Sequence, residues 1–162
     1  MQRLSMFRTT ATLACCLSLA GCGGSAEPKA KSEAKQFIVV SAVDCADNTG
    51  LEFSTCIDVL QKAIAEHDKS AVTYTKISAC ETAEGTDRCE RVDDKTYRAR
   101  LSAFQITMAA KPAAIPLYAG KLPTAGFRTA TNTDIAADAD AYIFTKSAAD
   151  AAHLYVDQKR RG

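Results

Sequence analysis

The chain has no tryptophan, and only 7% of its 162 residues are aromatic. A large site for stacking sugars or nucleobases is therefore not favoured, because such sites are built from aromatic rings. The formal net charge is +1, and no basic stripe runs along the sequence. This charge pattern gives no reason to expect nucleic acid as a partner, since nucleic-acid binding depends on clustered cations.

Signatures of catalysis and of cofactor binding are also missing. The sequence has no Gly-x-Ser-x-Gly motif and no glycine-rich loop that would hold a phosphate. Its two histidines, His67 and His153, are far apart, and neither has a second histidine or a cysteine four residues away, as a helical metal-binding pair would. His67 falls near the end of a predicted helix, where a structural role is favoured. We therefore predict no catalytic residue, no metal and no cofactor.

The first 22 residues have the layout of a secretory signal. Arg3 and Arg8 make the start basic, and residues 9–20 form an uncharged, mostly apolar run. This run has about 12 residues, whereas a membrane-spanning helix needs roughly 20, so a retained transmembrane anchor is not expected. The run ends in Leu-Ala-Gly-Cys, which resembles the lipobox of bacterial lipoproteins. In those proteins the cysteine, here Cys22, is acylated and becomes the first mature residue. An ordinary cleaved signal is the alternative.

The lipobox resemblance implies an address for the protein. Residues 1–21 would be the signal peptide, and residues 22–35 a lipidated N-terminus with a flexible tether that reaches roughly 20 Å. Acylated Cys22 would hold the protein on a lipid bilayer, because several buried acyl chains make attachment effectively permanent. Gly23 follows at the position where an Asp retains enteric lipoproteins in the inner membrane. The resemblance therefore implies the outer membrane, with the protein facing the periplasm.

Four cysteines follow the tether, namely Cys45, Cys56, Cys80 and Cys89. An even number in an exported chain predicts two disulfides, for which three connectivities are possible. Zinc is the rival interpretation, but structural zinc sites use cysteines two to four residues apart, and these pairs lack that spacing. They also lack the Cys-x-x-Cys spacing of disulfide oxidoreductases.

A short internal similarity bears on the pairing of these cysteines. Residues 41–56 and residues 78–89 each begin with a Ser-x-x-acid pattern, which is a helix-capping signature. Each then has a glycine that can end a helix, with one cysteine on either side of it. The similarity favours local pairing, Cys45 with Cys56 and Cys80 with Cys89. Cross-links between the two segments stay open.

Hydrophobic periodicity predicts the remaining elements. Residues 36–42 hold a β-branched run typical of a buried strand. Residues 96–108 alternate with period two but change phase at Phe104, which indicates a bulge. A helix over residues 55–68 would place Ile57, Leu60 and Ile64 on one face. Residues 112–123 contain three prolines and are expected to be loop or edge. Short strands are also expected at residues 127–131 and 142–145, and a last helix from Ser147 to about residue 155. Residues 72–77 are expected to be a short strand or an extended linker.

These elements predict an α+β fold. A small, disulfide-stapled helical N-terminal part would precede a small, mostly antiparallel sheet and a C-terminal helix. Residues 36–162 suffice for one globular domain. The alternative is two small subdomains, residues 36–95 and 96–162.

A resemblance to a known family rests on the order of several residues. The pattern is Asp44-Cys45, Cys56, Ala65-Glu66-His67, Ala71, Tyr74, Cys80-Glu81, Gly85 and Cys89, followed by residues 97–101, 103–105, 116–118 and 126–130. It resembles the YgiB-like family of uncharacterised bacterial lipoproteins over roughly residues 38–133. The chain departs from the family at Val72, where members usually have proline, and residues 134–162 match no segment of it. The resemblance implies a location but no activity and no catalytic residue.

Two classes of function follow from the sequence. The first is a non-enzymatic envelope lipoprotein, an adaptor or structural component that binds another protein or peptidoglycan. The missing catalytic motifs and the long tether favour it. The second is a small periplasmic hydrolase that acts on cell-wall material through paired carboxylates, Asp93 with Asp94 and Asp138 with Asp140. Paired acids also bind calcium, but solvated loops account for these residues better.

One further group of residues could line a recognition surface. Tyr118, Phe127 and Arg128 flank a segment rich in proline and glycine. Ordinary packing in the core is the favoured interpretation of these side chains.

Overall fold

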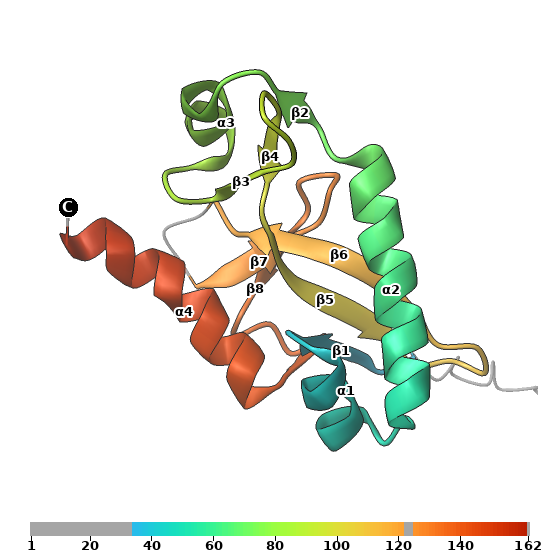
Figure 1. The fold of residues 1–162 in the computed structure, drawn as a ribbon. Helices are drawn as coiled ribbons and strands as arrows, with labels where there is room; N and C mark the ends of the chain where they lie inside the picture. The colour runs from blue at the N-terminus through green and yellow to red at the C-terminus, as the bar shows by residue number, and fades with distance from the viewer. Residues whose placement is uncertain (1–33, 122–124, 162) are drawn as a thin grey trace, which may run out of the picture. The chain divides into compact units, whose positions relative to one another are not determined.

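The computed structural model describes residues 34–121 and 125–161, which all belong to one compact unit, Glu33–Gly162. The predicted signal peptide and most of the predicted tether lie outside the described residues. The α+β class predicted from the sequence is confirmed, because helices and a mixed set of strands share this unit. Figure 1 shows the arrangement.

A six-stranded sheet forms the centre of the unit. Its strands are β1 (Gln36–Val39), β5 (Leu101–Thr107), β6 (Ala113–Ala119), β7 (Gly126–Arg128), β8 (Asp134–Ala136) and β9 (Ile143–Phe144), in the order β8-β7-β6-β5-β1-β9. Neighbouring strands run antiparallel except β1 and β9, which are parallel. The first strand thus pairs on both sides with strands from the second half of the chain. Separate subdomains for residues 36–95 and 96–162 do not fit this pairing.

Helices cover both faces of the sheet, and β1 shows why. Phe37 and Val39 pack on one face with α1 (Ala42–Thr49) and α2 (Phe53–Ser70). Ile38, between them, points to the opposite face because strand side chains alternate. There it packs against Ala148 and Ala152 of α4 (Lys146–Arg161).

A smaller sheet is attached to this body. It consists of β2 (Thr73–Tyr74), β4 (Tyr97–Ala99) and β3 (Cys89–Arg91) in the order β2-β4-β3, and α3 (Ile77–Glu84) packs on it. The chain passes at Arg100 from β4 of the small sheet directly into β5 of the large one. The two sheets are therefore joined by one nearly continuous stretch of extended chain, visible in Figure 1.

Both disulfides have the local pairing that the sequence favoured. Cys45 bonds Cys56 and joins α1 to α2, while Cys80 bonds Cys89 and joins α3 to β3. Cys45, Cys56 and Cys80 are fully buried, so the bridges also fill the core.

Both predicted ends are confirmed at α1, whereas at α3 only the C-terminal one is confirmed, because the helix ends at Glu84 and Gly85 follows it. Ser41 caps α1 by accepting a hydrogen bond from the backbone N–H of Asp44, and Gly50 ends the helix in the left-handed conformation. At α3 the predicted cap Ser78 is wrong, because the helix already begins at Ile77 and Lys76 precedes it without a side-chain cap. The last helix begins one residue earlier than predicted, with the Thr145 hydroxyl accepting from the N–H of Ala148.

The predicted face of α2 is wrong in phase. Its buried residues are Cys56, Val59, Leu60, Ala63 and His67, whereas Ile64 is exposed and Ile57 is only half-buried. The disulfide explains the difference, because it fixes Cys56 inward and so sets which residues of the helix face the sheet. A prediction that looks only for the helix face with the largest apolar side chains does not take the disulfide into account.

Residues 112–123 were expected to be loop or edge. Loop is wrong for the central part, but the half of β6 that carries Pro116 is indeed paired on one side only. Ala113–Ala119 form β6, which lies inside the sheet between β5 and β7. Pro116 is compatible with this position, since β7 pairs only with Tyr118 and Ala119 of β6. The half of β6 that carries the proline pairs only with β5. Because Pro116 has no second neighbouring strand, its missing N–H removes no hydrogen bond on that side.

The other strand predictions are confirmed near residues 72–77, 127–131 and 142–145, where β2, β7 and β9 lie. The bulge is confirmed too, because the register with β6 shifts between Leu101 and Ala103. The three-residue strands β3 and β8 were not predicted.

Candidate functional site

A cluster of charged and aromatic side chains fills the junction between the two sheets. Its members come from six elements, and we refer to them as the junction cluster: His67 of α2, Glu84 of α3, Glu90 of β3, Arg98 of β4, Tyr118 of β6 and Arg128 of β7. The cluster is the largest group of interacting polar side chains that the structure describes. It is therefore the place to look for chemistry.

His67 is the centre of one half of the cluster. It is 1% exposed, with Nδ1 2.9 Å from the Tyr118 hydroxyl oxygen and Nε2 3.4 Å from Oε1 of Glu90. The neutral tautomer that carries its proton on Nε2 satisfies every partner, because the Tyr118 hydroxyl then donates to Nδ1 and Nε2–H donates to Glu90. The ring is thus fully bonded while uncharged.

Arg98 ties Glu90 to the end of α2. Its Nε donates to Oε1 of Glu90 over 2.7 Å, and its Nη1 lies 2.8 Å from Oδ1 of Asp68. Burial opposes the charge on Arg98, but the hydrogen bonds to Glu90 and Asp68 outweigh it and raise the pKa of the guanidinium. Arg98 therefore stays charged and links the small sheet to α2.

Arg128 is the centre of the other half. It is 5% exposed and donates from Nη2 to Glu84 and from Nη1 to Asn132, while its guanidinium lies 5.1 Å from the centre of the Tyr118 ring. This is cation–π geometry. Its Nε is buried and makes no hydrogen bond within the described residues. The Tyr74 hydroxyl also donates to Glu84, over 2.9 Å.

Burial changes the acidity of both tyrosines. It raises the pKa of Tyr118, and the positive charges of Arg128 and Arg98 oppose the rise without cancelling it. Burial also raises the pKa of Tyr74, with a further rise from the hydrogen bond to Glu84. Both hydroxyls are therefore kept protonated, as donors.

The arrangement favours a structural role for the junction cluster. His67 and Tyr118, the two groups best suited to proton transfer, are 1% and 4% exposed and so are shielded from solvent. What the cluster does is hold α2, α3 and both sheets together. Removing one member of a buried ion pair typically costs about 3–5 kcal/mol, because the partner charge is left buried and unpaired.

The three residues that were weighed as a recognition surface, with core packing favoured, lie in this cluster or in the core. Tyr118, Phe127 and Arg128 are 4%, 1% and 5% exposed, which agrees with core packing. Phe127 stacks on Phe144 with ring centres 6.0 Å apart.

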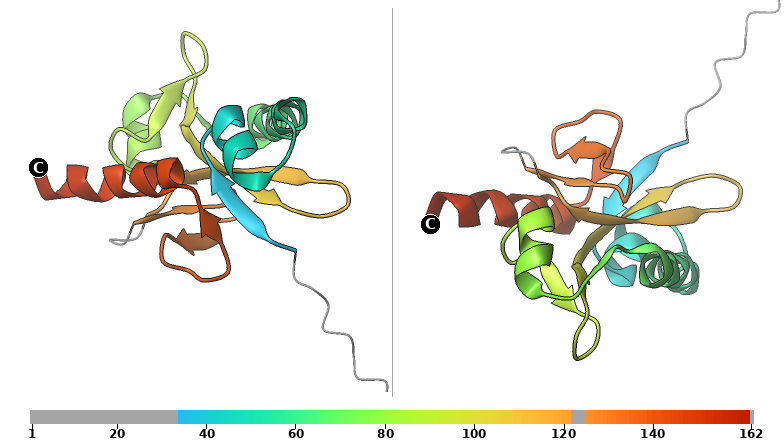
Figure 2. Two further views of the ribbon diagram at one scale, coloured as in Figure 1. Left: turned by 90° about the horizontal axis from the view of Figure 1, so that it is seen from below. Right: turned by 90° about the horizontal axis from the view of Figure 1, so that it is seen from above.

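The paired acids of the hydrolase hypothesis are not brought together. Asp93 and Asp94 are exposed in the loop between β3 and β4, whereas Asp138 and Asp140 are exposed in the segment after β8. These two segments lie on opposite sides of the unit in both views of Figure 2. The backbone N–H of Lys95 donates to Asp93 and lowers the pKa of its carboxyl, which is ordinary loop chemistry.

The other candidates are also placed by the structure. His153 is exposed on α4 and remote in sequence from His67. Within residues 34–121 and 125–161, no three His, Cys, Asp or Glu side chains are grouped as a metal site would need. None of the helices there is both long and apolar enough to span a bilayer. Cys22, the predicted lipidation site, lies outside the described residues.

Sequence reasoning missed Glu84, Glu90 and Arg98. A signal existed for Arg98, because Tyr97 and Ala99 alternate with Arg98 and Arg100 and so predict one charged face. No local pattern identified β3 as the partner strand, and the acids could not be assigned to the arginines without it.

Comparisons with known proteins give one match. A family model described as "Protein of unknown function (DUF1190)" matches residues 32–147. The match covers every element up to the first turn of α4, and with it the whole junction cluster and both disulfides. The search of curated proteins and the search of solved structures each found no match.

Proposed function

The chain belongs to the DUF1190 family of proteins of unknown function, and from this premise we propose that it is a lipid-anchored bacterial envelope lipoprotein that acts by binding. The uncharacterised family expected from the sequence is confirmed at this coarser level. The finer assignment, to YgiB-like lipoproteins, is part of the proposal.

One observation carries the proposal, the sequence Leu-Ala-Gly-Cys at residues 19–22 after a short apolar run. An acylated Cys22 would bury several fatty chains in a bilayer, each CH₂ contributing about 0.8 kcal/mol. Strand β1 begins at Gln36, so about a dozen residues separate the anchor from the sheet. This spacing lets the folded unit stand off the bilayer and reach a partner.

The disulfides support an exported location. Two bridges, Cys45–Cys56 and Cys80–Cys89, join elements of the core. Disulfides persist in oxidising compartments such as the bacterial periplasm and are rare in the cytosol. With Gly23 rather than Asp after the anchor, the proposed location is the outer membrane, facing the periplasm.

The proposal assigns binding rather than catalysis. The groups best suited to acid–base chemistry, in the junction cluster, are buried and bonded to one another. The paired acids stand on separate exposed loops. A rigid body on a long tether suits an adaptor or structural component whose partner is an envelope protein or peptidoglycan.

Lipid attachment is tested by labelling. Cells that express the full chain are grown with radioactive palmitate, and the protein is captured and counted. Cys22→Ser should abolish the label, whereas Cys16→Ser, which alters a cysteine inside the predicted signal, should retain it. Mass spectrometry of the mature N-terminal peptide should find diacylglyceryl on Cys22. Label that persists in Cys22→Ser, or a mature chain that begins elsewhere, would refute the proposal.

The binding role is tested in two further ways. Crosslinking in cells followed by mass spectrometry should recover a specific envelope protein or a peptidoglycan fragment, and a blank result would count against an adaptor. A variant with Asp93, Asp94, Asp138 and Asp140 all changed to Asn should keep its function in cells. Loss of function with the fold intact would instead favour the hydrolase.

A further inference from the structure

The chain enters the folded unit beside the hairpin that joins β5 to β6. The backbone N–H of Met108, the first residue after β5, donates to the carbonyl oxygen of Lys35 over 2.8 Å. Gln36, the first residue of β1, pairs with Thr107 at the end of β5. We refer to residues 108–112 as the hairpin tip. An anchor that precedes Lys35 therefore holds the hairpin tip, on average, nearer to its attachment point than the far end of the unit.

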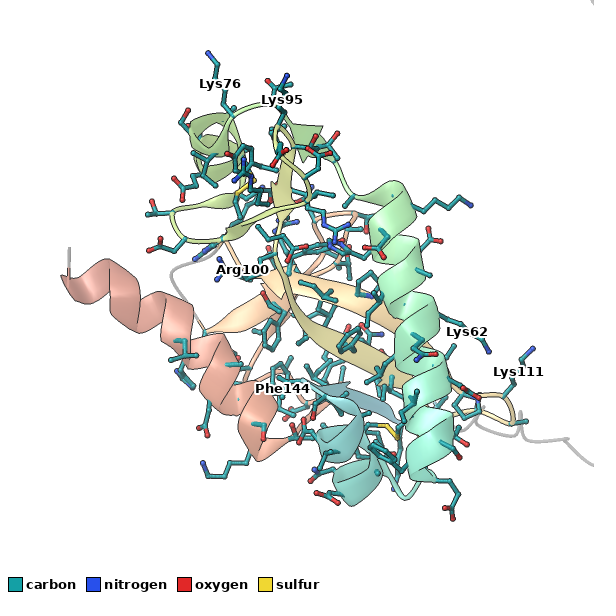
Figure 3. The ribbon with its side chains drawn as sticks, viewed as in Figure 1. Lys62, Lys76, Lys95, Arg100, Lys111 and Phe144 are labelled. Carbon is teal, nitrogen blue, oxygen red and sulfur yellow. A yellow bond between two sulfur atoms is a disulfide. The ribbon has the colours of Figure 1, made fainter. Side chains whose placement is uncertain are left out.

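The hairpin carries positive charge and no negative charge. No Asp or Glu occurs between Asp94 and Asp134, a span that includes β5, the hairpin tip and β6. Lys35 and Lys111 are exposed, and neither forms an ion pair with a carboxylate that the structure describes. Figure 3 shows Lys111 at this hairpin and Lys95 at a separate end of the unit. The side on which the chain enters thus has two cations that are free to meet an anionic surface.

Exposed apolar side chains lie beside these cations. Ala109 and Ala110 of the hairpin tip and Ala113 of β6 are exposed, and Ile115 is 42% exposed. Ala114 packs with the core under α1 and α2, so Ile115, the next residue, points to the opposite face of the sheet. On that face α4 packs mainly on β7, β1 and β9. The apolar side chains at the hairpin end of β6 are therefore left without a cover.

The hairpin between β3 and β4 provides a comparison within the same chain. It also carries an exposed apolar residue, Val92, which is 46% exposed, and an exposed lysine, Lys95. It differs in having two exposed acids between them, Asp93 and Asp94. These carboxylates outnumber the lysine and would be repelled by anionic headgroups. Of these two hairpins, only the one beside the chain entry combines exposed apolar groups with unopposed positive charge.

We propose that the hairpin tip, together with Ile115, docks on the surface of an anionic lipid bilayer. This docking rests on the proposed lipid anchor, which keeps the unit within reach of a bilayer. A short flexible tether gives an effective concentration of about millimolar, so a contact too weak to form from solution becomes populated. Lysines are attracted to anionic headgroups, and exposed apolar side chains enter the interfacial layer.

Docking would give the anchored unit a preferred orientation. The hairpin tip would face the bilayer, and the hairpin between β3 and β4 would remain in water. The tether also allows the unit to leave the surface, so the docked state is in equilibrium with a free one. Salt should shift this equilibrium toward the free state, because it screens the attraction between lysines and headgroups.

The test places the mature chain on nanodiscs and measures which side chains approach the lipid. Residues 22–162 are produced without the predicted signal, and Cys22 is coupled to a maleimide-bearing lipid, since the four cysteines of the described part are in disulfides. The nanodiscs contain phosphatidylcholine, with phosphatidylglycerol added in one series, and a nitroxide-labelled lipid broadens nearby methyl signals in the NMR spectrum. The isoleucine methyl of Ile115 is the probe. Ile77 is its matched control, because it is 40% exposed and follows Lys76, which Figure 3 shows at the other end of the unit.

With phosphatidylglycerol present, the Ile115 signal should be broadened several-fold more than the Ile77 signal, and the difference should shrink without the anionic lipid. Lys111→Gln should lower the docking equilibrium constant about fivefold, which is the usual contribution of one lysine at an anionic surface. Lys95→Gln, the same substitution on the other hairpin, should leave it unchanged. Both lysines are exposed in turns, so neither variant is expected to disturb the fold.

Equal broadening of Ile115 and Ile77, no effect of phosphatidylglycerol, or equal effects of Lys111→Gln and Lys95→Gln would overturn the proposal. So would a change at Ile115 that occurs only when several chains share a nanodisc, because the occupant would then be a second copy. Chemical coupling replaces acylation in this test, so its result does not depend on what Cys22 carries in cells. Docking without palmitate label in cells would refute the anchor alone, and label without docking would refute the docking surface alone.

Discussion

The imidazole Nδ1 of His67 lies 2.9 Å from the hydroxyl oxygen of Tyr118 across 51 residues of sequence. This bond joins α2 to β6, and it places the histidine where its other nitrogen meets Glu90 of the small sheet. The buried side chain of His67 thus joins α2 to both the large sheet and the small one. The free energy of unfolding should therefore depend on these contacts.

Tyr118→Phe should destabilise the protein by about 1–2 kcal/mol, because it leaves Nδ1 of His67 buried without a donor. The ring remains, so the contact with Arg128 is kept. Urea unfolding followed by circular dichroism measures the loss. Tyr142→Phe is the control, since Tyr142 is half-buried and its hydroxyl makes no hydrogen bond to any residue that the structure describes. Equal effects of the two variants would show that the bond to His67 is not important.

The raised pKa of Tyr118 predicts that the protein becomes less stable at alkaline pH. Burial raises the pKa of Tyr118 above its usual value of 10.0. The stability from the protonated hydroxyl is complete below about pH 10 and is lost as the pH rises through the folded-state pKa, because the unfolded chain releases its proton first. Unfolding free energies measured at pH 8 and pH 11 should therefore differ less in Tyr118→Phe than in the unchanged protein. An identical difference in both would contradict this prediction.

Substitutions of Glu84 or Arg128 should destabilise the protein more than substitutions in an exposed ion pair. Their side chains are 11% and 7% exposed, so removing either leaves a largely buried charge. Arg128→Met should destabilise the protein by about 3 kcal/mol or more, and Glu84→Gln combined with it should restore part of the loss. Lys146→Met is the control, since its pair with Asp150 is exposed and is expected to contribute under about 1 kcal/mol. Denaturant unfolding of the three variants and the unchanged protein gives the comparison, and a double variant less stable than Arg128→Met would contradict it.

The elements that could be predicted from the sequence are those set by local patterns. Ser41 and Gly50 bound α1 because a cap and a left-handed residue are local devices. The phase change near Ala103 and Phe104 predicted the bulge because alternation is also local. The class of the fold followed from these patterns together.

The elements that escaped prediction depend on contacts between distant segments. The phase of α2 is set by the bond from Cys56 to Cys45, and β6 tolerates Pro116 because β7 is too short to pair beside it. The junction cluster escaped for the same reason. His67 meets Glu90 and Tyr118 only once α2, β3 and β6 are assembled.

Two glycines provide the last prediction, because they are required for different reasons. A Cβ on Gly126 would lie 2.4 Å from the carbonyl oxygen of Ile135, in the paired strand β8. Gly50 has open space around its Cβ position but a φ of +77°. Gly126→Ala should therefore destabilise the protein by about 2 kcal/mol through overpacking, and Gly50→Ala by about 1 kcal/mol through backbone strain.

Asparagine separates these two causes. It tolerates the left-handed conformation, so Gly50→Asn should be milder than Gly50→Ala. It is larger than alanine, so Gly126→Asn should be more destabilising than Gly126→Ala, because the backbone of β8 cannot move aside without breaking its pairing with β7. Thermal unfolding of the four variants gives the ranking. If asparagine were the milder substitution at Gly126 as well, the close approach of β7 and β8 would not be the reason for a glycine there.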